Sequence, residues 1–351
     1  MNVLSLFDGC SGARLALARA DKEVDQYFTC EIDKYASMVT KLNFPNTTQL
    51  GDVTKVNFEM LPKIDLLIGG SPCQDLSFAK GNGKGLEGER SGLFYKYFEA
   101  LEVLRKKNPE IKFLLENVKM KQEWKDIISE KLGVQPIFIN SADFSAQNRQ
   151  RLYWTNIPVD EWIPCDDKLQ DILEDGQVDR DKSHCLDANY FKGGNLKSYF
   201  EKHRRQLVFT GGAYRGRYNT DGSTSQKLEI RKDSKSNALT TVSKDSLCIQ
   251  VGEADIKGRD VIKRVYSPEG KSPTLTTCGG GHREPKVYVP PLQWRKLTPI
   301  ECERLQTVPD NYTKCGQKET GEIVEISNTQ RYKMLGNGFT IATVAHIIKN
   351  L

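Results

Sequence analysis

Short apolar runs alternate with helical patterns through the first 157 residues, and this alternation limits the fold more than any other feature. The apolar runs, which are typical of buried strands, cover residues 3–7, 27–30, 64–68, 111–115, 137–139 and 152–154. Helical patterns lie between them over residues 13–20, 34–42 and 91–107. Strands that alternate with helices at this spacing predict βαβ units. We therefore expect an α/β fold, with a mixed, mostly parallel sheet and helices on both of its faces.

The pattern changes near Pro164. From there to Leu292 no helical period is sustained, and Gly, Ser, Thr, Asn and Lys dominate. A seven-residue segment recurs in this stretch: residues 235–241 and 271–277 match at five positions, by chance or as a duplicated loop-strand unit. Helical patterns return from Pro299. We expect one domain over residues 1–165, a smaller, irregular, β-rich domain over residues 166–292, and a C-terminal segment over residues 293–351.

Composition narrows the class of protein. Hydrophobic residues make up 38% of the chain and charged residues 28%, which excludes an integral membrane protein and an intrinsically disordered one. The nine cysteines form no Cys-x-x-Cys pair, so we expect neither a zinc site nor a disulfide framework. The N-terminus has no charged segment followed by a long apolar one. These features predict a reduced protein of the cytoplasm, with no metal and no membrane contact.

The net charge of +5 is mildly basic, and its distribution is more informative than its size. Residues 200–235 contain nine Lys and Arg but four Asp and Glu, a local excess equal to that of the whole chain. A solvated loop explains this stretch as well as a surface that faces phosphates does, so both interpretations remain open.

A glycine-containing turn and two acidic residues indicate a nucleotide-like pocket. Residues 7–12, Phe-Asp-Gly-Cys-Ser-Gly, lie between the first strand and the first helix, where glycines allow a ligand to approach the helix N-terminus. Glu31 follows Gly9 by 22 residues, a position that suits ribose hydroxyls. Asp52 lies 21 residues further on, where a carboxylate can accept from an exocyclic amine. Each acid alone fits a surface charge, whereas together they favour an adenosine-containing cofactor, either NAD or S-adenosylmethionine.

Four further side chains form a candidate catalytic group. Cys73 follows Gly-Gly-Ser-Pro at the carboxyl end of a predicted parallel strand, where α/β sheets place their sites, and Glu116 ends the next such strand. A thiolate beside a carboxyl group suits addition to an electrophilic ring with a proton donor opposite. Arg149 and Arg151 point the same way if their segment is extended, and can neutralise an anion, a carbonyl or the carboxylate. A solvated basic turn explains the two arginines equally well.

Taken together, these motifs resemble those of the DNA (cytosine-5)-methyltransferase family, in the family's order and over essentially the whole chain. Residues 7–12 resemble its first motif, and residues 72–74 (Pro-Cys-Gln), 116–118 (Glu-Asn-Val) and 147–151 (Gln-x-Arg-x-Arg) resemble its catalytic motifs. Residues 295–302 resemble the segment that organises its recognition domain, and residues 335–338 resemble its last motif. Parts of these motif sequences are also similar to those of the vertebrate de novo enzymes, although Gln74 follows the bacterial form.

The resemblance implies a class I methyltransferase fold of Rossmann type, with a target recognition domain over residues 166–292. It implies S-adenosyl-L-methionine as cofactor and a cytosine flipped out of double-stranded DNA as substrate. Cys73 would add to ring carbon 6, Glu116 would act at ring nitrogen 3, and Arg151 would bind the base carbonyl, supported by Arg149. The residues expected to bind the cofactor are Phe7, Asp8, Gly9, Ser11, Gly12, Glu31, Ile32, Asp52, Val53, Ser71, Pro72, Asn337 and Gly338.

DNA contacts are expected from the segment after Cys73, which resembles the family's closing loop, and from the basic and threonine-rich parts of the recognition domain. The residues are Gln74, Ser77, Lys80, Lys84, Arg90, Arg204, Arg205, Arg215, Arg217, Thr240, Thr241, Thr276 and Thr277. Ser11 stands where the family usually has Gly, and Gly338 where it usually has Ser or Ala. Both departures fall in the predicted cofactor pocket, so we expect altered cofactor affinity at most.

Three other functions compete with this one. A transfer RNA methyltransferase on the same fold lacks support, since the recognition stretch is long and that branch's Cys-Phe-Thr signature is absent. A silent DNA-binding relative would lack Cys73 or Glu116, and a dehydrogenase would leave both unused. We expect a monomer from a bacterium or a phage-infected cell, associated with DNA. A functional pairing with a restriction endonuclease remains open.

Overall fold

The computed structural model describes residues 1–72, 93–194, 196–209 and 294–351, and the backbone of five strands between residues 213 and 287. The chain divides into two compact units. The first comprises residues 1–174, 180–207 and 296–351, and the second comprises residues 175–179 and 208–295. Residues 166–174 and 180–207, which lie in the range expected for the recognition domain, thus group with the first unit.

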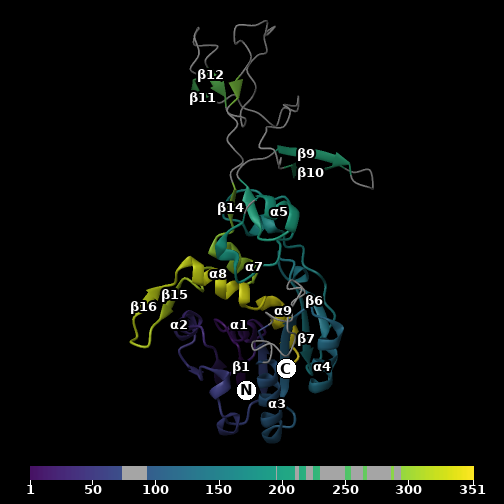
Figure 1. Cartoon of the computed structure of the whole chain (residues 1–351), viewed down its shortest axis with the longest axis vertical. Helices are drawn as coiled ribbons and strands as arrows, with labels where there is room; N and C mark the ends of the chain where they lie inside the picture. Colours follow the sequence, from purple (N-terminus) through teal and green to yellow (C-terminus); the bar gives the residue numbers. More distant parts are fainter. Residues whose placement is uncertain are drawn as a thin grey trace. The chain divides into compact units, whose positions relative to one another are not determined.

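A seven-stranded sheet forms the centre of the first unit, in the order β3-β2-β1-β4-β5-β7-β6. Figure 1 labels β1, β6 and β7 of this sheet. Its strands are β1 (Asn2–Leu6), β2 (Gln26–Cys30), β3 (Thr47–Gln49), β4 (Leu66–Gly70), β5 (Lys112–Val118), β6 (Ile137–Asn140) and β7 (Gln150–Thr155). The first five run parallel to one another, and β7 pairs antiparallel with both β5 and β6. This mixed, mostly parallel sheet confirms the predicted α/β fold.

The helices of the first unit agree with the sequence patterns where a pattern was recognised. They are α1 (Gly12–Arg19), α2 (Lys34–Asn43), α3 (Leu93–Lys107), α4 (Gln122–Leu132), α5 (Leu196–Lys202), α7 (Pro299–Leu305), α8 (Asn328–Asn337) and α9 (Ile341–Ile348). A hairpin of β15 (Cys315–Gln317) and β16 (Ile323–Glu325) precedes α8. Among the described residues, no helix is both long and apolar enough to cross a membrane.

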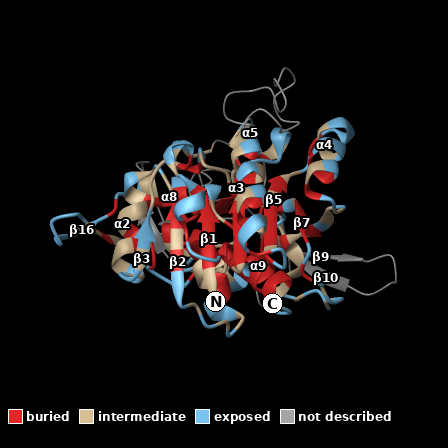
Figure 2. Ribbon diagram, turned by 90° about the horizontal axis from the view of Figure 1, so that it is seen from below, coloured by how far each residue is buried: buried red, intermediate tan, exposed pale blue. Residues whose placement is uncertain are grey.

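The core of the first unit lies between the sheet and its helices. Leu4, Leu6, Phe113 and Trp154 on the strands share one buried cluster with apolar side chains of α3 and α4. Right-handed crossovers that run from β1 to β2 and from β4 to β5 travel in opposite directions, so α1 and α3 cover opposite faces. The last helix, α9, packs against the first, α1. Figure 2 shows β1 and β5 mostly buried, as a parallel sheet with two covered faces requires.

The second unit is described chiefly through its strands. The antiparallel pair β9 (Ala213–Tyr218) and β10 (Thr224–Glu229) forms one small sheet. A second contains β11 (Gln250–Glu253), β12 (Arg264–Tyr266) and β13 (Lys286–Val287). β8 (Leu207–Phe209) and β14 (Trp294–Lys296) pair at the two ends of this stretch. These short strands agree with the expectation of an irregular, β-rich region.

The strand order reverses between β1 and β4, because the chain first builds outward from β1 to β3 and then returns to place β4 on its other side. In open α/β sheets, the crevice at the carboxyl ends of the strands beside such a reversal is where ligands bind. The turn after β1 and the segments after β2, β4 and β5 all reach this edge. Gly9, Glu31 and Ser71, three of the residues predicted to bind the cofactor, lie on these segments.

Candidate active site

The turn after β1 has an unusual backbone. Phe7, Gly9 and Ser11 all have positive φ angles, 58°, 59° and 62°. Residues other than glycine rarely adopt such angles. The amides of Phe7 and Asp8 both donate to the Cys30 carbonyl of the neighbouring strand, at 2.9 and 3.3 Å. A left-handed conformation costs a residue with a side chain roughly 1–2 kcal/mol, so neighbouring contacts must hold this turn in shape.

Asp8 supplies such contacts from within the protein. Its side chain is 4% exposed, and four hydroxyl groups donate to its carboxylate. Ser5 at 2.5 Å and Tyr27 at 2.8 Å donate to Oδ1, while Ser11 at 2.9 Å and Thr29 at 3.0 Å donate to Oδ2. Burial raises the pKa of Asp8, although the four hydroxyls act in the opposite direction. The Asp8 carboxylate is thus fully hydrogen-bonded within the protein. The cofactor contact predicted for Asp8 can therefore involve only its backbone.

Glu31 lies at the end of β2 and faces the turn. Its Oε2 accepts from the Gly9 amide at 2.8 Å, and its Oε1 accepts from the Ile32 and Asp33 amides at 2.8 and 2.7 Å. Burial nevertheless raises the pKa of Glu31 above its ordinary value. Ile32 beside it is 80% exposed, a large apolar side chain open to solvent. The pair combines an acceptor with an apolar surface at the strand end.

Asp52 and Val53 differ in what they offer a ligand. The Oδ1 of Asp52 accepts from both the amide and the hydroxyl of Thr54, at 2.9 and 2.8 Å, and these bonds lower the pKa of Asp52. The side chain of Val53 is 5% exposed and belongs to the main apolar cluster. The predicted cofactor contact of Val53 therefore does not extend to its side chain.

The ends of β4 and β5 lie side by side and place Glu116, the predicted acid, next to Gly70. Gly70 pairs with Glu116 in the parallel register, and a Cβ at Gly70 would lie 3.0 Å from Glu116 Oε2. One residue further along each strand, the side-chain amide of Asn117 donates to Ser71 Oγ at 2.9 Å, with both groups buried. This bond holds Ser71 at the end of β4. Cys73, two residues further along the chain, is the first residue of a stretch that lies outside the described residues. Asn117 was part of a recognised motif but was not predicted as a site residue.

The two arginines of residues 149–151 have different environments. Arg151 Nε lies 2.7 Å from Glu116 Oε1, and both side chains are largely buried. Arg149 is also buried, but its guanidinium donates to the carbonyls of Leu186 at 3.0 Å, Gly336 at 3.4 Å and Gly338 at 2.8 Å. Arg151 is therefore paired with the predicted acid, whereas Arg149 fastens the C-terminal segment to the sheet. The predicted role of Arg149 in supporting the base pocket stays a prediction.

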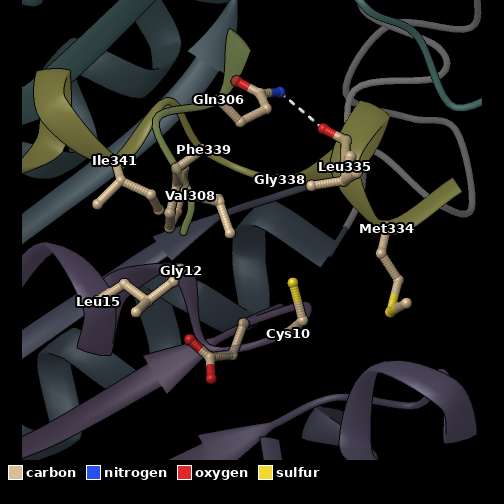
Figure 3. A pocket seen from close by; sticks show the side chains of 11 residues that line it. Cys10, Gly12, Leu15, Gln306, Val308, Met334, Leu335, Gly338, Phe339 and Ile341 are labelled. Carbon is tan, nitrogen blue, oxygen red and sulfur yellow. Dashed lines mark hydrogen bonds between the residues drawn. The ribbon is translucent and has the colours of Figure 1, made fainter. Parts of the chain in front are cut away.

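The C-terminal segment completes the wall of a pocket beside the β1 turn (Figure 3). The Phe339 ring lies 3.4 Å from a Cβ placed at Gly12 and 3.1 Å from one placed at Gly70, so it touches both the turn and the end of β4. Asn337 is exposed and Gly338 half-buried. Phe339 was missed as a site residue, and its place directly after Gly-Asn-Gly was the only signal for it. The pocket is lined by Asp8, Cys10, Gly12, Leu15, Gln306, Val308, Met334, Leu335, Gly338, Phe339 and Ile341.

Few of the predicted DNA contacts lie within the described residues. Arg204 forms an exposed ion pair with Asp187 at 3.1 Å, and the Arg205 guanidinium donates to the Gly193 carbonyl at 2.6 Å. For Arg215 and Arg217 the structure gives only the backbone of β9. Both copies of the repeat, residues 235–241 and 271–277, lie outside the described residues. So do the remaining predicted residues, which are Gln74, Ser77, Lys80, Lys84, Arg90, Thr240, Thr241, Thr276 and Thr277.

Relatives in sequence are methyltransferases. The orphan methyltransferase M.Rho11sI of Bacillus phage rho11s is 28% identical, with 100% of this chain and 97% of that protein covered. The type II methyltransferase M.HhaI of Haemophilus parahaemolyticus is also 28% identical, with 100% of this chain and 94% of that protein covered.

Solved structures agree on the fold. Entamoeba histolytica methyltransferase EhMeth has a TM-score of 0.57 at 13% identity, with 100% of this chain and 97% of that one covered. A DNMT2 mutant of Spodoptera frugiperda has a TM-score of 0.51 at 17% identity, with 99% and 98% covered. A family model described as C-5 cytosine-specific DNA methylase matches residues 1–351. The chain belongs to this family of cytosine-5 DNA methyltransferases.

Proposed function

We propose that this protein transfers a methyl group from S-adenosyl-L-methionine to carbon 5 of a cytosine flipped out of a specific double-stranded DNA sequence. The observation that carries the proposal is the pairing of Glu116 with Arg151 beside Gly70, three residues before Cys73. The predicted acid, Glu116, and the predicted ligand of the base carbonyl, Arg151, thereby meet from the neighbouring strands β5 and β7. The proposal also draws on the family of C-5 cytosine-specific DNA methylases, and on the relatives M.Rho11sI, an orphan methyltransferase, and M.HhaI, a type II methyltransferase.

The described residues fit S-adenosyl-L-methionine. Glu31 offers carboxylate oxygens for ribose hydroxyls, and the exposed Ile32 side chain offers an apolar surface for the adenine ring. A Cβ at Gly9 would meet nothing within 4 Å, so the turn has open space beside it. Phe7, Gly12, Asp52, Ser71, Pro72, Asn337 and Gly338 are the other residues that would hold the cofactor. When bound, S-adenosyl-L-methionine supplies an electrophilic methyl group.

The protein's own residues would make the cytosine reactive. The Cys73 thiolate forms a bond to ring carbon 6, and the electrons of the 5,6 double bond move towards carbon 5. Glu116 donates a hydrogen bond or proton to ring nitrogen 3, which favours this addition. Arg151 binds the base carbonyl and holds the Glu116 carboxyl in place. After carbon 5 is methylated, a base removes its proton, and the electrons of that bond expel the Cys73 thiolate.

Bisulfite sequencing of plasmid DNA from cells that express this protein tests the proposal directly. A host that lacks cytosine methylation would express either the wild-type chain or the Cys73→Ser variant, and its plasmid DNA would be sequenced after bisulfite treatment. We expect protected cytosines in one recurring sequence context with the wild type and none with Cys73→Ser. Complete conversion with both soluble proteins would contradict the proposal. Methylation of transfer RNA by the wild type in that case would favour the alternative RNA substrate.

A further inference from the structure

The carboxylate of Asp8 joins four elements of the fold through hydroxyl groups. Ser5 belongs to β1, Tyr27 and Thr29 belong to β2, and Ser11 is the N-cap residue directly before α1. The Ser11 hydroxyl also lies 2.8 Å from Thr40 Oγ1 on α2. Because the Ser11 hydroxyl donates to Asp8, Thr40 is the donor in this second contact. A single buried carboxylate thus fixes the start of α1 against both strands and, through Ser11, against α2.

Ser11 has a conformation that its residue type does not favour. Its φ of 62° and ψ of 42° lie in the left-handed region. A serine at this position usually caps the helix by accepting from a backbone amide of the first turn. Here the side chain makes no such bond, is completely buried, and is used entirely by Asp8 and Thr40. The contacts that offset the left-handed conformation are therefore the ones to Asp8 and Thr40.

We propose that Asp8 is a positioning residue that holds Ser11 left-handed and so shapes residues 9–12, the segment predicted to receive S-adenosyl-L-methionine. The inference rests on the proposed cofactor. The side chain of Asp8 acts on that cofactor only through Ser11, since its carboxylate is enclosed by four hydroxyls. Glycine adopts the left-handed conformation without a side-chain penalty, so a glycine at position 11 makes the contact with Asp8 dispensable for the shape of the turn.

A double-mutant cycle tests this coupling. Calorimetry would measure the affinity for S-adenosylhomocysteine in the wild type, Asp8→Asn, Ser11→Gly and the double variant. We expect Asp8→Asn to weaken binding roughly tenfold when Ser11 is present and less than threefold in the Ser11→Gly background. In the Asp8→Asn enzyme, the KM for S-adenosyl-L-methionine should rise while kcat changes less. An equal loss in both backgrounds would show that Asp8 does not act through Ser11.

A second pair of variants covers the case in which Asp8→Asn fails to fold. Both variants keep Asp8 and lose the hydroxyl that donates to it. Ser11→Ala retains the energetic cost of a left-handed backbone at residue 11, whereas Ser11→Gly removes that cost. We expect Ser11→Ala to bind S-adenosylhomocysteine at least about tenfold more weakly than Ser11→Gly, because the alanine resists the left-handed conformation. Equal affinities of the two variants would overturn the proposal.

Amide hydrogen exchange of residues 9–15, measured without ligand, separates this inference from the proposed function. Faster exchange in Asp8→Asn that is restored in the double variant supports the positioning role even if the wild type binds no S-adenosylhomocysteine. Unchanged exchange in Asp8→Asn, alongside normal binding by the wild type, contradicts the positioning role and leaves the proposed cofactor intact.

Discussion

At the scale of single residues, two arginines at a spacing of two have distinct roles. The alternation of side chains along a strand predicts that Arg149 and Arg151 point to the same side of β7. It does not reveal what each one meets, because the partners of Arg149 come from Leu186, Gly336 and Gly338, far away in sequence. Arg151 meets Glu116 because β5 and β7 are neighbours in the sheet.

The Glu116→Gln variant tests the acid of the proposed mechanism. Glutamine keeps the shape of the side chain but cannot protonate ring nitrogen 3, so methyl transfer should fall by roughly 10²–10⁴. Binding of S-adenosylhomocysteine should stay within about twofold of the wild type, as the cofactor residues are untouched. Single-turnover transfer of labelled methyl groups to DNA measures the first quantity, and calorimetry measures the second. The control is Glu123→Gln, an exposed acid on α4, and equal activities of the two variants would exclude Glu116 as the acid.

At the scale of elements, the sequence predicted most of the sheet and the place of its ligand edge. β1, β2, β4, β5, β6 and β7 appear where the apolar runs are, since buried parallel strands are nearly continuous in hydrophobicity. The short β3 and the exposed hairpin of β15 and β16 carry no such run and were not recognised. Helices α4 and α8 were also missed, because they bury few apolar residues and much of their surface is polar.

The two glycines that flank Asn337 make a matched test of packing at the end of α8. A Cβ at Gly336 would lie 2.3–2.5 Å from backbone atoms of Asp187 and Ala188, which cannot move aside cheaply. Gly338 has an ordinary φ of −74°, and a Cβ there would lie 3.2 Å from the Met334 carbonyl oxygen. We expect Gly336→Ala to lower the free energy of unfolding by about 2–4 kcal/mol and Gly338→Ala by less than about 1 kcal/mol. Urea unfolding measures both, and equal losses would contradict the close packing of α8 against residues 187–188.

At the scale of the whole molecule, residues near the C-terminus close the fold around a buried charge. The Glu303 carboxylate is completely buried and accepts from the Arg331 guanidinium at 2.9 Å and from the amides of Asn311 and Thr313 at 2.7 and 2.9 Å. It thereby ties α7, the following loop and α8 together. Because α8 and the residues after it form one wall of the pocket beside β1, this tie also bears on the site.

Removal of the buried Glu303 carboxylate should lower the free energy of unfolding far more than removal of the exposed Asp310 carboxylate. Glu303→Ala leaves Arg331 buried without its carboxylate, which should lower the free energy of unfolding by about 3–5 kcal/mol. Asp310→Ala breaks the exposed pair with Arg304, at 2.6 Å, and should cost about 0–1 kcal/mol. Denaturant unfolding of the two variants gives the comparison. A loss for Glu303→Ala as small as that for Asp310→Ala would mean that the C-terminal segment is held by other contacts.

We expect the affinity for the cofactor to depend on pH through Glu31. A rise in pH should increase this affinity, whereas it should decrease the contribution of Glu31 to folding stability. Burial raises the folded-state pKa of Glu31 above the ordinary 4.5. A raised folded-state pKa means that Glu31 contributes its full stabilisation of the fold below the ordinary pKa value. This stabilisation is lost as the pH rises through the folded-state pKa. Ribose hydroxyls, by contrast, donate to the ionised carboxylate, so a bound ligand lowers the pKa of Glu31. Affinity for the cofactor should therefore rise with pH while Glu31 ionises in the free protein, and then level off.

S-adenosylhomocysteine is the suitable probe for this prediction, because its amino and carboxyl groups change charge little between about pH 5 and pH 7. Calorimetry across that interval should show affinity increasing with pH in the wild type. Glu31→Gln should bind more weakly at pH 7 and lose most of the pH dependence, since its amide does not titrate. An unchanged slope in Glu31→Gln would assign the titration to another group, such as the buried Asp8, whose pKa is also raised. The Asp8→Asn protein, measured over the same interval, would then decide between the two carboxyls.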